Sequence, residues 1–342
     1  MKRIWLIFTL LACLSSPVQA LDLTVPTVPG VEYSENQSFS EAVLEILGEA
    51  VSHFQPDLRE AAGVCVTVLA AVAVLSVLSV VPGKKIGVQL AGAVLVATVL
   101  LEPAHALISL GADTVMELGE YEKLLLPVLT AALAAQGGVG TSAVLYAGTA
   151  AFNALLSGLI SGVLVPILYI YLALAVGHAA VGEEMLKKLR DLVRSAAVWG
   201  LKTVLYVYTG YITITGVVSG TTDTSLLKAA KLTISGAVPV VGGILSDASE
   251  AVLVSAAVVK NTAGIYGLLA ILSLWIGPFL RIGAHYLMVK AVGTVSGVFG
   301  MDGVTSVIDA FAAAMGMLLA MTGAVCLMLI IGTICFLRGV GV

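Results

Sequence analysis

The sequence predicts an all-α membrane protein, a polytopic bundle of transmembrane helices. Of its 342 residues, 59% are hydrophobic and only 11% are charged, and the mean hydropathy is +1.06. Soluble domains carry about a quarter charged residues and roughly 45–50% apolar ones. The composition therefore excludes a soluble enzyme, and the combination of 36 glycines with 6% aromatic residues favours closely packed helices.

The first twenty residues have the organisation of a secretory signal peptide. Two basic residues, Lys2 and Arg3, precede a short apolar run over 4–14, and small residues lead up to Ala20. This run is shorter than the roughly 20 residues that a spanning helix needs. We predict cleavage after Ala20 and an extracytoplasmic mature N-terminus. An uncleaved anchor and a lipoprotein site at Cys13 are the alternatives.

Residues 21–60 form an acidic segment that is predicted to be exported. It contains eight acidic residues and one basic residue, and acidic segments are not retained by the positive-inside rule. The first part, 21–33, contains prolines and glycine at turn positions and is predicted to be an extended linker. A capping box at Ser38–Glu41 then starts an amphipathic helix that should end near Pro56. This helix either covers the bundle, lies on the outer membrane surface or docks on a partner.

Residues 61–342 are predicted to form the transmembrane domain, because charge-free runs of about 20 residues can cross the bilayer. The first run, Ala61–Gly83, is followed by Lys84 and Lys85, which place that turn in the cytoplasm. A second crossing begins at residue 86, and an acidic loop over 113–123 is expected outside. Further charge-free runs cover 124–182, 203–222, 261–280 and 310–337. The whole pattern predicts about eight crossings.

The 59 residues 124–182 contain no Asp, Glu, Lys or Arg and must hold an odd number of crossings, because a basic cytoplasmic segment follows them. Three short spans broken near Gly137–Gly138 and Ser161–Gly162 satisfy this condition. A re-entrant piece over 124–136 followed by one long tilted helix satisfies it equally well. The next segment, 183–199, is predicted to be a cytoplasmic amphipathic helix that either binds anionic lipid or acts as a solvated connector.

A short, interrupted hydrophobic segment at 232–246 is the predicted functional feature. It has 15 charge-free residues with a proline and a glycine pair inside, and such segments form re-entrant or broken helices that line cavities. The charged residues after it lie on one helix face at i and i+3, and ionisable groups near the bilayer usually face protein or water. The alternative is an interfacial loop with its charges among the lipid headgroups. The candidate pore or subunit-contact residues are Pro239, Gly242, Gly243, Ser246, Asp247, Glu250, Lys260 and Asn261.

The sequence offers no pattern of catalytic, cofactor or metal chemistry. The four histidines are scattered, and the cysteines of the predicted mature chain (Cys65, Cys326 and Cys335) lie within predicted spans. No phosphate-binding loop, dinucleotide fingerprint, H-E-x-x-H zinc motif or G-x-S-x-G nucleophile motif occurs. We therefore predict no enzyme activity, no cofactor and no catalytic or metal-binding residue.

A dense series of motifs runs from Gly200 to Gly264. It comprises G-L-K-T at 200–203, T-I-T-G-V-V-S at 213–219, K-A-A-K at 228–231, I-S-G-A-V-P-V-V-G-G at 234–243, L-S-D-A at 245–248, Glu250, Lys260 and Asn261. In order and density these residues resemble the stage III sporulation protein AE family of endospore-forming bacteria. The resemblance extends more loosely over the rest of the chain.

That resemblance implies a multi-pass protein of the mother-cell membrane around the forespore. The family belongs to the stage III A channel complex, which is similar to specialised secretion systems. The implied partners are the other stage III A proteins and, through them, a forespore-membrane partner. We therefore expect a non-enzymatic, permease-like membrane core; an autonomous small-solute permease and a non-conducting scaffold are the alternatives. The lipid bilayer is a further expected partner, a homo-oligomer is compatible with the sequence, and no nucleic acid is expected.

Overall fold

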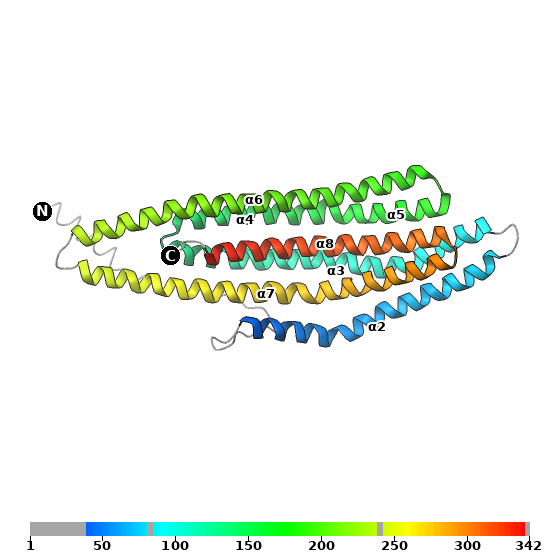
Figure 1. Ribbon diagram of the computed structural model, residues 1–342, viewed down its shortest axis with the longest axis horizontal. Coiled ribbons are helices and arrows are strands. Elements are labelled where there is room, and N and C mark those ends of the chain that lie inside the picture. Colours follow the sequence, from blue (N-terminus) through cyan, green and yellow to red (C-terminus); the bar gives the residue numbers. More distant parts are fainter. Residues whose placement is uncertain (1–38, 81–84, 238–241, 339–342) are drawn as a thin grey trace.

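The structure is a computed structural model, and it describes residues 39–80, 85–237 and 242–338. Within these ranges, only the backbone is described for residues 85–86, 215–257 and 259. All regular elements over this part of the chain are helical, and they form an elongated bundle (Figure 1). The helices are α2 (Phe39–Ser79), α3 (Lys85–Ala135), α4 (Val139–Leu159), η1 (Ile160–Leu164), α5 (Val165–Val181), α6 (Glu184–Ala237), α7 (Gly242–Val298) and α8 (Asp302–Arg338). The predicted signal peptide, 1–20, and the linker that follows it lie outside the described residues.

The helices are long relative to a bilayer. At about 1.5 Å per residue, the 51 residues of α3 extend for about 76 Å, whereas the hydrocarbon core of a bilayer is about 30 Å thick. Within the described residues, five helical segments are long and apolar enough to cross a membrane: Phe39–Ser79, Gly87–Ala135, Val139–Val181, Lys260–Val298 and Asp302–Arg338. The all-α, multi-pass fold is thus confirmed, while the predicted eight crossings are not.

Charged residues and prolines do not interrupt the helices where the sequence suggested. The predicted outside loop at 113–123 is wrong, because these residues continue α3 and place Asp113, Glu117 and Glu120 on its exposed side. The predicted helix end near Pro56 is also wrong, because Pro56 lies inside α2. A proline removes one backbone hydrogen bond and bends a helix, and α2 changes direction along its length (Figure 1). The amphipathic helix at 183–199 forms the beginning of the longer α6.

The long charge-free segment contains one reversal of the chain. Gly137 adopts a left-handed backbone with φ of 90° in the turn between α3 and α4, so the predicted break near Gly137–Gly138 is confirmed. The break near Ser161–Gly162 is not a reversal. These residues form the π-helical turn η1, which joins α4 to α5 directly before Pro166, and a wider turn accommodates a residue that lacks an N–H. Residues 124–136 form the end and the turn of α3, not a re-entrant piece.

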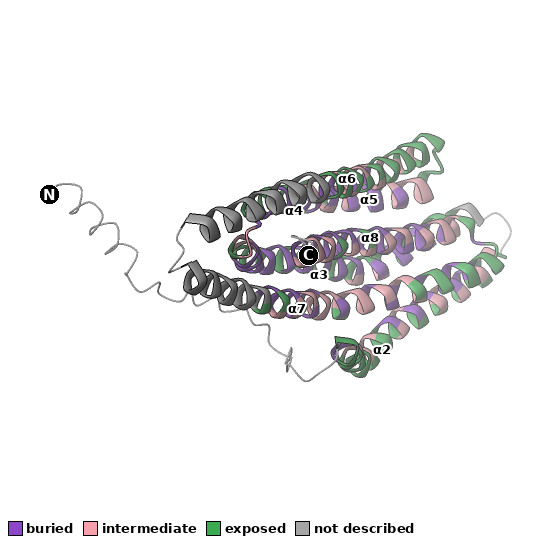
Figure 2. Ribbon diagram, turned by 60° about the vertical axis from the view of Figure 1, so that its left-hand side comes forward, coloured by how far each residue is buried: buried purple, intermediate pink, exposed green. Residues whose placement is uncertain are grey.

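The central helix is α8, which contacts α3, α4, α5, α6 and α7. Twenty of its 37 residues are buried, from Val304 near its start to Phe336 near its end. Figure 2 shows buried residues along α8 and on the sides of its neighbours that face it. The outer helix α2 is linked to α7 by two ion pairs of Arg281. Its Nη2 lies 2.9 Å from Glu60 Oε2, and its Nε lies 3.5 Å from Asp57 Oδ1.

A close helix contact surrounds Gly332 of α8. The Tyr208 hydroxyl, from α6, donates a 3.1 Å hydrogen bond to the backbone oxygen of Met328 one turn earlier in α8. A Cβ atom at position 332 would lie only 2.8 Å from the Tyr208 hydroxyl oxygen and 3.0 Å from Thr149 Cγ2 of α4. Glycine therefore allows three helices to meet here, as small residues do in membrane bundles.

This contact predicts that Gly332→Ala destabilises the bundle, because overpacking of a tight contact costs about 1–3 kcal/mol. Gly323→Ala in the same helix is the matched control, since its new Cβ would meet no atom closer than 4.0 Å. Thermal unfolding in detergent should show a lower Tm for Gly332→Ala and an unchanged Tm for the control. Equal Tm values for both variants would contradict the contact.

Candidate functional site

A cavity of about 670 Å³ lies between α5, α6, α7 and α8. It is close to the end of the bundle where α6 and α8 begin and α7 ends. Six charged residues line this charged cavity, three basic and three acidic: Arg190, Asp191, Arg194, Lys290, Asp302 and Asp309. In a chain with so few ionisable residues, this is a marked concentration of charge.

Two glycine turns bring the charged helix ends together. Gly182 closes α5 in a left-handed conformation with φ of 79°, and its N–H donates a 2.7 Å bond to the carbonyl of His178. The His178 ring reinforces the turn, because its Nδ1 donates to the Glu183 carbonyl at 3.0 Å. Gly300, with φ of 67°, makes the corresponding turn between α7 and α8. Neither turn suits a residue with a side chain, and both place the first turns of α6 and α8 beside the cavity.

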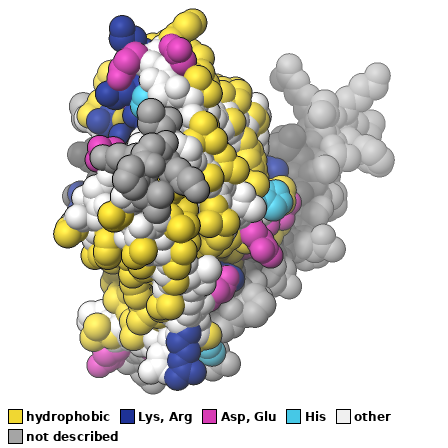
Figure 3. All heavy atoms as spheres, turned by 90° about the vertical axis from the view of Figure 1, so that its right-hand side faces the viewer, with side chains coloured by type: hydrophobic (Ala, Val, Ile, Leu, Met, Phe, Trp, Pro, Cys, Tyr) yellow, Lys and Arg dark blue, Asp and Glu magenta, His cyan; other side chains and the backbone are white. Residues whose placement is uncertain are grey.

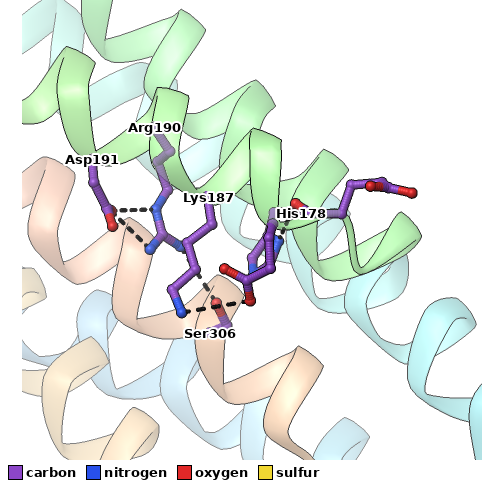
Figure 4. Close-up of polar contacts among 7 residues, drawn as sticks. His178, Lys187, Arg190, Asp191 and Ser306 are labelled. Carbon is purple, nitrogen blue, oxygen red and sulfur yellow. Dashed lines mark hydrogen bonds and ion pairs between the residues drawn. The ribbon is translucent and has the colours of Figure 1, made fainter.

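Arg190 is the charged residue that connects two of these helices. Its guanidinium lies 2.9 Å from Asp191 Oδ1, and its Nη1 donates a 3.5 Å hydrogen bond to the Ser306 hydroxyl across the gap from α6 to α8 (Figure 4). The side chain is only 15% exposed. Arg190 therefore points from α6 into the bundle, although its helix lies at the periphery.

The second ion pair closes the opposite wall of the cavity. Lys290 Nζ of α7 lies 2.7 Å from Asp309 Oδ1 of α8, and both side chains are about half exposed. Between the two pairs lie hydroxyl groups from α8, among them the Thr305 hydroxyl oxygen, which is buried without a hydrogen-bond partner in the protein. Buried polar atoms are normally satisfied, by water where protein groups do not reach. The cavity is therefore suited to hold water.

The outward side of α6 has the opposite character. Met185, Leu192 and Trp199 are 77%, 64% and 71% exposed, and they recur at a spacing of seven residues, so they share one helix face. Figure 3 looks onto this end of the bundle and shows extensive hydrophobic surface, with charged side chains at the upper rim and further ones at the lower end and the right-hand margin. An apolar outer face beside charged groups that line a cavity is the arrangement expected for a helix bundle in lipid.

The residues predicted as a pore lining lie elsewhere. Pro239 is outside the described residues, and Gly242, Gly243, Ser246, Asp247 and Glu250 lie on the first turns of α7, where only the backbone is described. Lys260 is buried and Asn261 is exposed. Glu250 and Lys290 are separated by 40 residues of one helix, or about 60 Å, so the predicted residues do not join the charged cavity. The segment 232–246 is divided between the end of α6 and the start of α7, and its predicted role stays a prediction.

The sequence contains one pattern that could have predicted the charged cavity, and it lies at the start of α8. Asp302 and Asp309 are seven residues apart, with Thr305 and Ser306 between them, and together they make a polar stripe at the start of the central, largely buried helix α8. Such a stripe on a buried helix requires a polar partner. Across the described residues, no group of three His, Cys, Asp or Glu side chains is placed to hold a metal ion.

Comparison with known proteins identifies the family. A family model described as "Stage III sporulation protein AE" matches residues 34–340, which is most of the chain. The chain belongs to the stage III sporulation protein AE family. One curated relative, Stage III sporulation protein AE of Bacillus subtilis (strain 168), is 26% identical over 183 residues, which cover 53% of this chain and 46% of the relative. No solved structure gives a significant match. The AE family membership assigns the chain to sporulation, and its five apolar helices fit a multi-pass membrane protein.

In this AE family member, Arg190→Met should destabilise the bundle more than Lys187→Met. The first change removes a mostly buried hydrogen-bonded charge and leaves Asp191 and Ser306 without their partner, at a cost of about 1–2 kcal/mol. Lys187 pairs with Glu184 at 3.8 Å in an exposed position, and such pairs contribute about 0–1 kcal/mol. Thermal unfolding in detergent measures both. A Tm that falls equally for the two variants would show that Arg190 does not connect α6 to α8.

Proposed function

We propose that this protein is the non-enzymatic membrane core of a sporulation channel complex between the mother cell and the forespore. The observation that carries the proposal is the charged cavity, which is lined by residues of four helices in an otherwise apolar bundle. In this proposal the protein lies in the mother-cell membrane around the forespore, with its mature N-terminus outside the cytoplasm after removal of residues 1–20. Its partners are the other stage III A proteins and, through them, a forespore-membrane protein.

The energetic cost of the charges supports a functional cavity. Ionisable groups within a membrane bundle are costly and usually face protein or a water-filled cavity, so a cluster of them marks a candidate water-filled or substrate pathway. Here six charged groups line one cavity, and two of the three basic residues form ion pairs. Arg190 pairs with Asp191 within α6, and Lys290 of α7 pairs with Asp309 of α8. A bundle that served only as an anchor could fill this space with apolar side chains at no such cost.

The length of the helices supports assembly with other proteins. Because α3 is more than twice as long as the hydrocarbon core is thick, part of it extends beyond a single bilayer. The exposed acidic residues Asp113, Glu117 and Glu120 lie on the second half of this helix, where they are available to partners in the aqueous phase. The same exposed carboxylates argue against a compact, self-contained permease.

The proposal predicts that removal of the Lys290–Asp309 pair abolishes function without unfolding the protein. In the spore-forming host, the chromosomal copy would be replaced by the Lys290→Met, Asp309→Leu double variant, because apolar replacement of both partners of an ion pair is often neutral for stability. The Glu184→Gln, Lys187→Met double variant removes the exposed pair on α6 and is the control. We expect spore counts to fall at least about a hundredfold for the cavity variant only, since a charged interior path loses its polar lining.

Two further measurements distinguish the outcomes of that experiment. Membrane fractions show whether the variant is present, and affinity purification shows whether the stage III A proteins still accompany it. Lost spores with an intact complex support the conducting core. Lost spores together with a lost complex favour the scaffold, and normal spore counts contradict a role for the charged cavity. Solute uptake by the purified protein alone in liposomes would favour an autonomous permease.

A further inference from the structure

A second cavity, of about 460 Å³, lies between α3 and α4, away from the charged cavity. It contains Glu122, whose residue surface is only 4% exposed and whose Oε1 atom has no hydrogen-bond partner in the protein. Other acidic residues of α3, such as Asp113, Glu117 and Glu120, are exposed. Glu122 is thus an exception on its own helix, and its burial requires an explanation.

Burial of an unpaired carboxylate is strongly unfavourable, because the charge loses its hydration. Buried charges in proteins are therefore paired with an opposite charge, neutralised, or bound to a metal ion. Lys123 lines the same cavity and attracts Glu122 electrostatically, but its side chain is exposed and forms no ion pair within 4.0 Å of that carboxylate. The remaining titratable groups near Glu122 are Glu120 and Tyr146, which line the cavity, and Tyr208 of α6, which interacts with it electrostatically.

Two residues of α4, Asn153 and Ser157, supply neutral oxygen atoms to the same cavity. Asn153 is 4% exposed, and the Ser157 hydroxyl donates to its side-chain oxygen at 3.4 Å. Both residues line the cavity with Glu122. Gly119, one turn before Glu122, lies close to both residues, because a Cβ there would be in van der Waals contact with Asn153 Nδ2 at 3.5 Å and Ser157 Oγ at 3.6 Å.

We propose that the cavity between α3 and α4 binds a monovalent alkali cation through Glu122, Asn153 and Ser157. Carboxylate, amide and hydroxyl oxygens are hard ligands suited to such ions. One buried carboxylate balances a single positive charge, whereas calcium sites in proteins usually collect several carboxylates. The cation would supply the partner that Glu122 lacks, while the volume of the cavity leaves room for water to complete the coordination. This site does not depend on the channel role proposed above.

Thermal unfolding of the purified full-length protein in detergent tests the site. Sodium chloride, potassium chloride and choline chloride would be compared at equal ionic strength and constant pH. A ligand that binds only the folded state raises Tm in proportion to its occupancy, so sodium or potassium should raise Tm over choline. Glu122→Gln should remove this difference. Glu120→Gln, an exposed residue beside the same cavity, should keep it.

A milder variant covers the case in which Glu122→Gln fails to fold. Ser157→Ala keeps the carboxylate and removes one neutral ligand, so the cation midpoint should rise about tenfold. Equal Tm values in choline and in both alkali salts would overturn the proposal. So would a cation effect that persists in Glu122→Gln. If Tm depends on pH through Glu122 and on no cation, the site holds a proton only, and the proposal of an alkali cation is wrong.

Discussion

The structure depends on one constraint: charged side chains of a lipid-facing bundle must find their partners inside the protein or in enclosed water. The central helix α8 is buried along most of its length and supplies almost no charge except at its start, where Asp309 meets Lys290 of α7. Arg190 reaches the same region from α6, and Arg281 of α7 holds the outer helix α2 through Asp57 and Glu60. Each of these contacts joins two helices, so the few charges also determine which helices are neighbours.

The general architecture could be predicted from the sequence because composition and charge-free runs report directly on solvation by lipid. The lengths of the helices could not be predicted in the same way. Charge-free runs show where a chain can cross a membrane, but a helix can continue past the charged residues at the end of such a run. In α3 the acidic residues lie on the exposed side of a helix that simply continues past the bilayer thickness. The prediction that a helix ends near Pro56 was wrong for a related reason. A helix can continue through a proline when packing on both sides compensates for one lost backbone hydrogen bond and for the bend.

The candidate site was predictable only in part. The segment 183–199, which contains Arg190, Asp191 and Arg194, was predictable as an amphipathic helix, but its sequence could not say that its polar face includes a residue directed into the bundle. The structure shows the apolar stripe of Met185, Leu192 and Trp199 on the outside, which the exposed surface of a soluble helix would not have. Glu122 gave no distinguishing pattern among its acidic neighbours, because its burial depends on the approach of α4 from a distant part of the sequence. The predicted role of the residues at 239–261 stays a prediction.

The central claim is that charged groups occupy an aqueous interior while the apolar face of α6 meets lipid. Cysteine accessibility in native membranes tests it most directly. The single-cysteine variants would be made in a protein whose Cys65, Cys326 and Cys335 are replaced by serine. Ala313 lines the charged cavity and Leu192 lies on the outer face of α6. The account predicts that Ala313→Cys reacts with a small water-soluble maleimide, whereas Leu192→Cys reacts only with a lipid-soluble reagent. The reverse pattern, with Leu192→Cys open to water and Ala313→Cys inert, would contradict it.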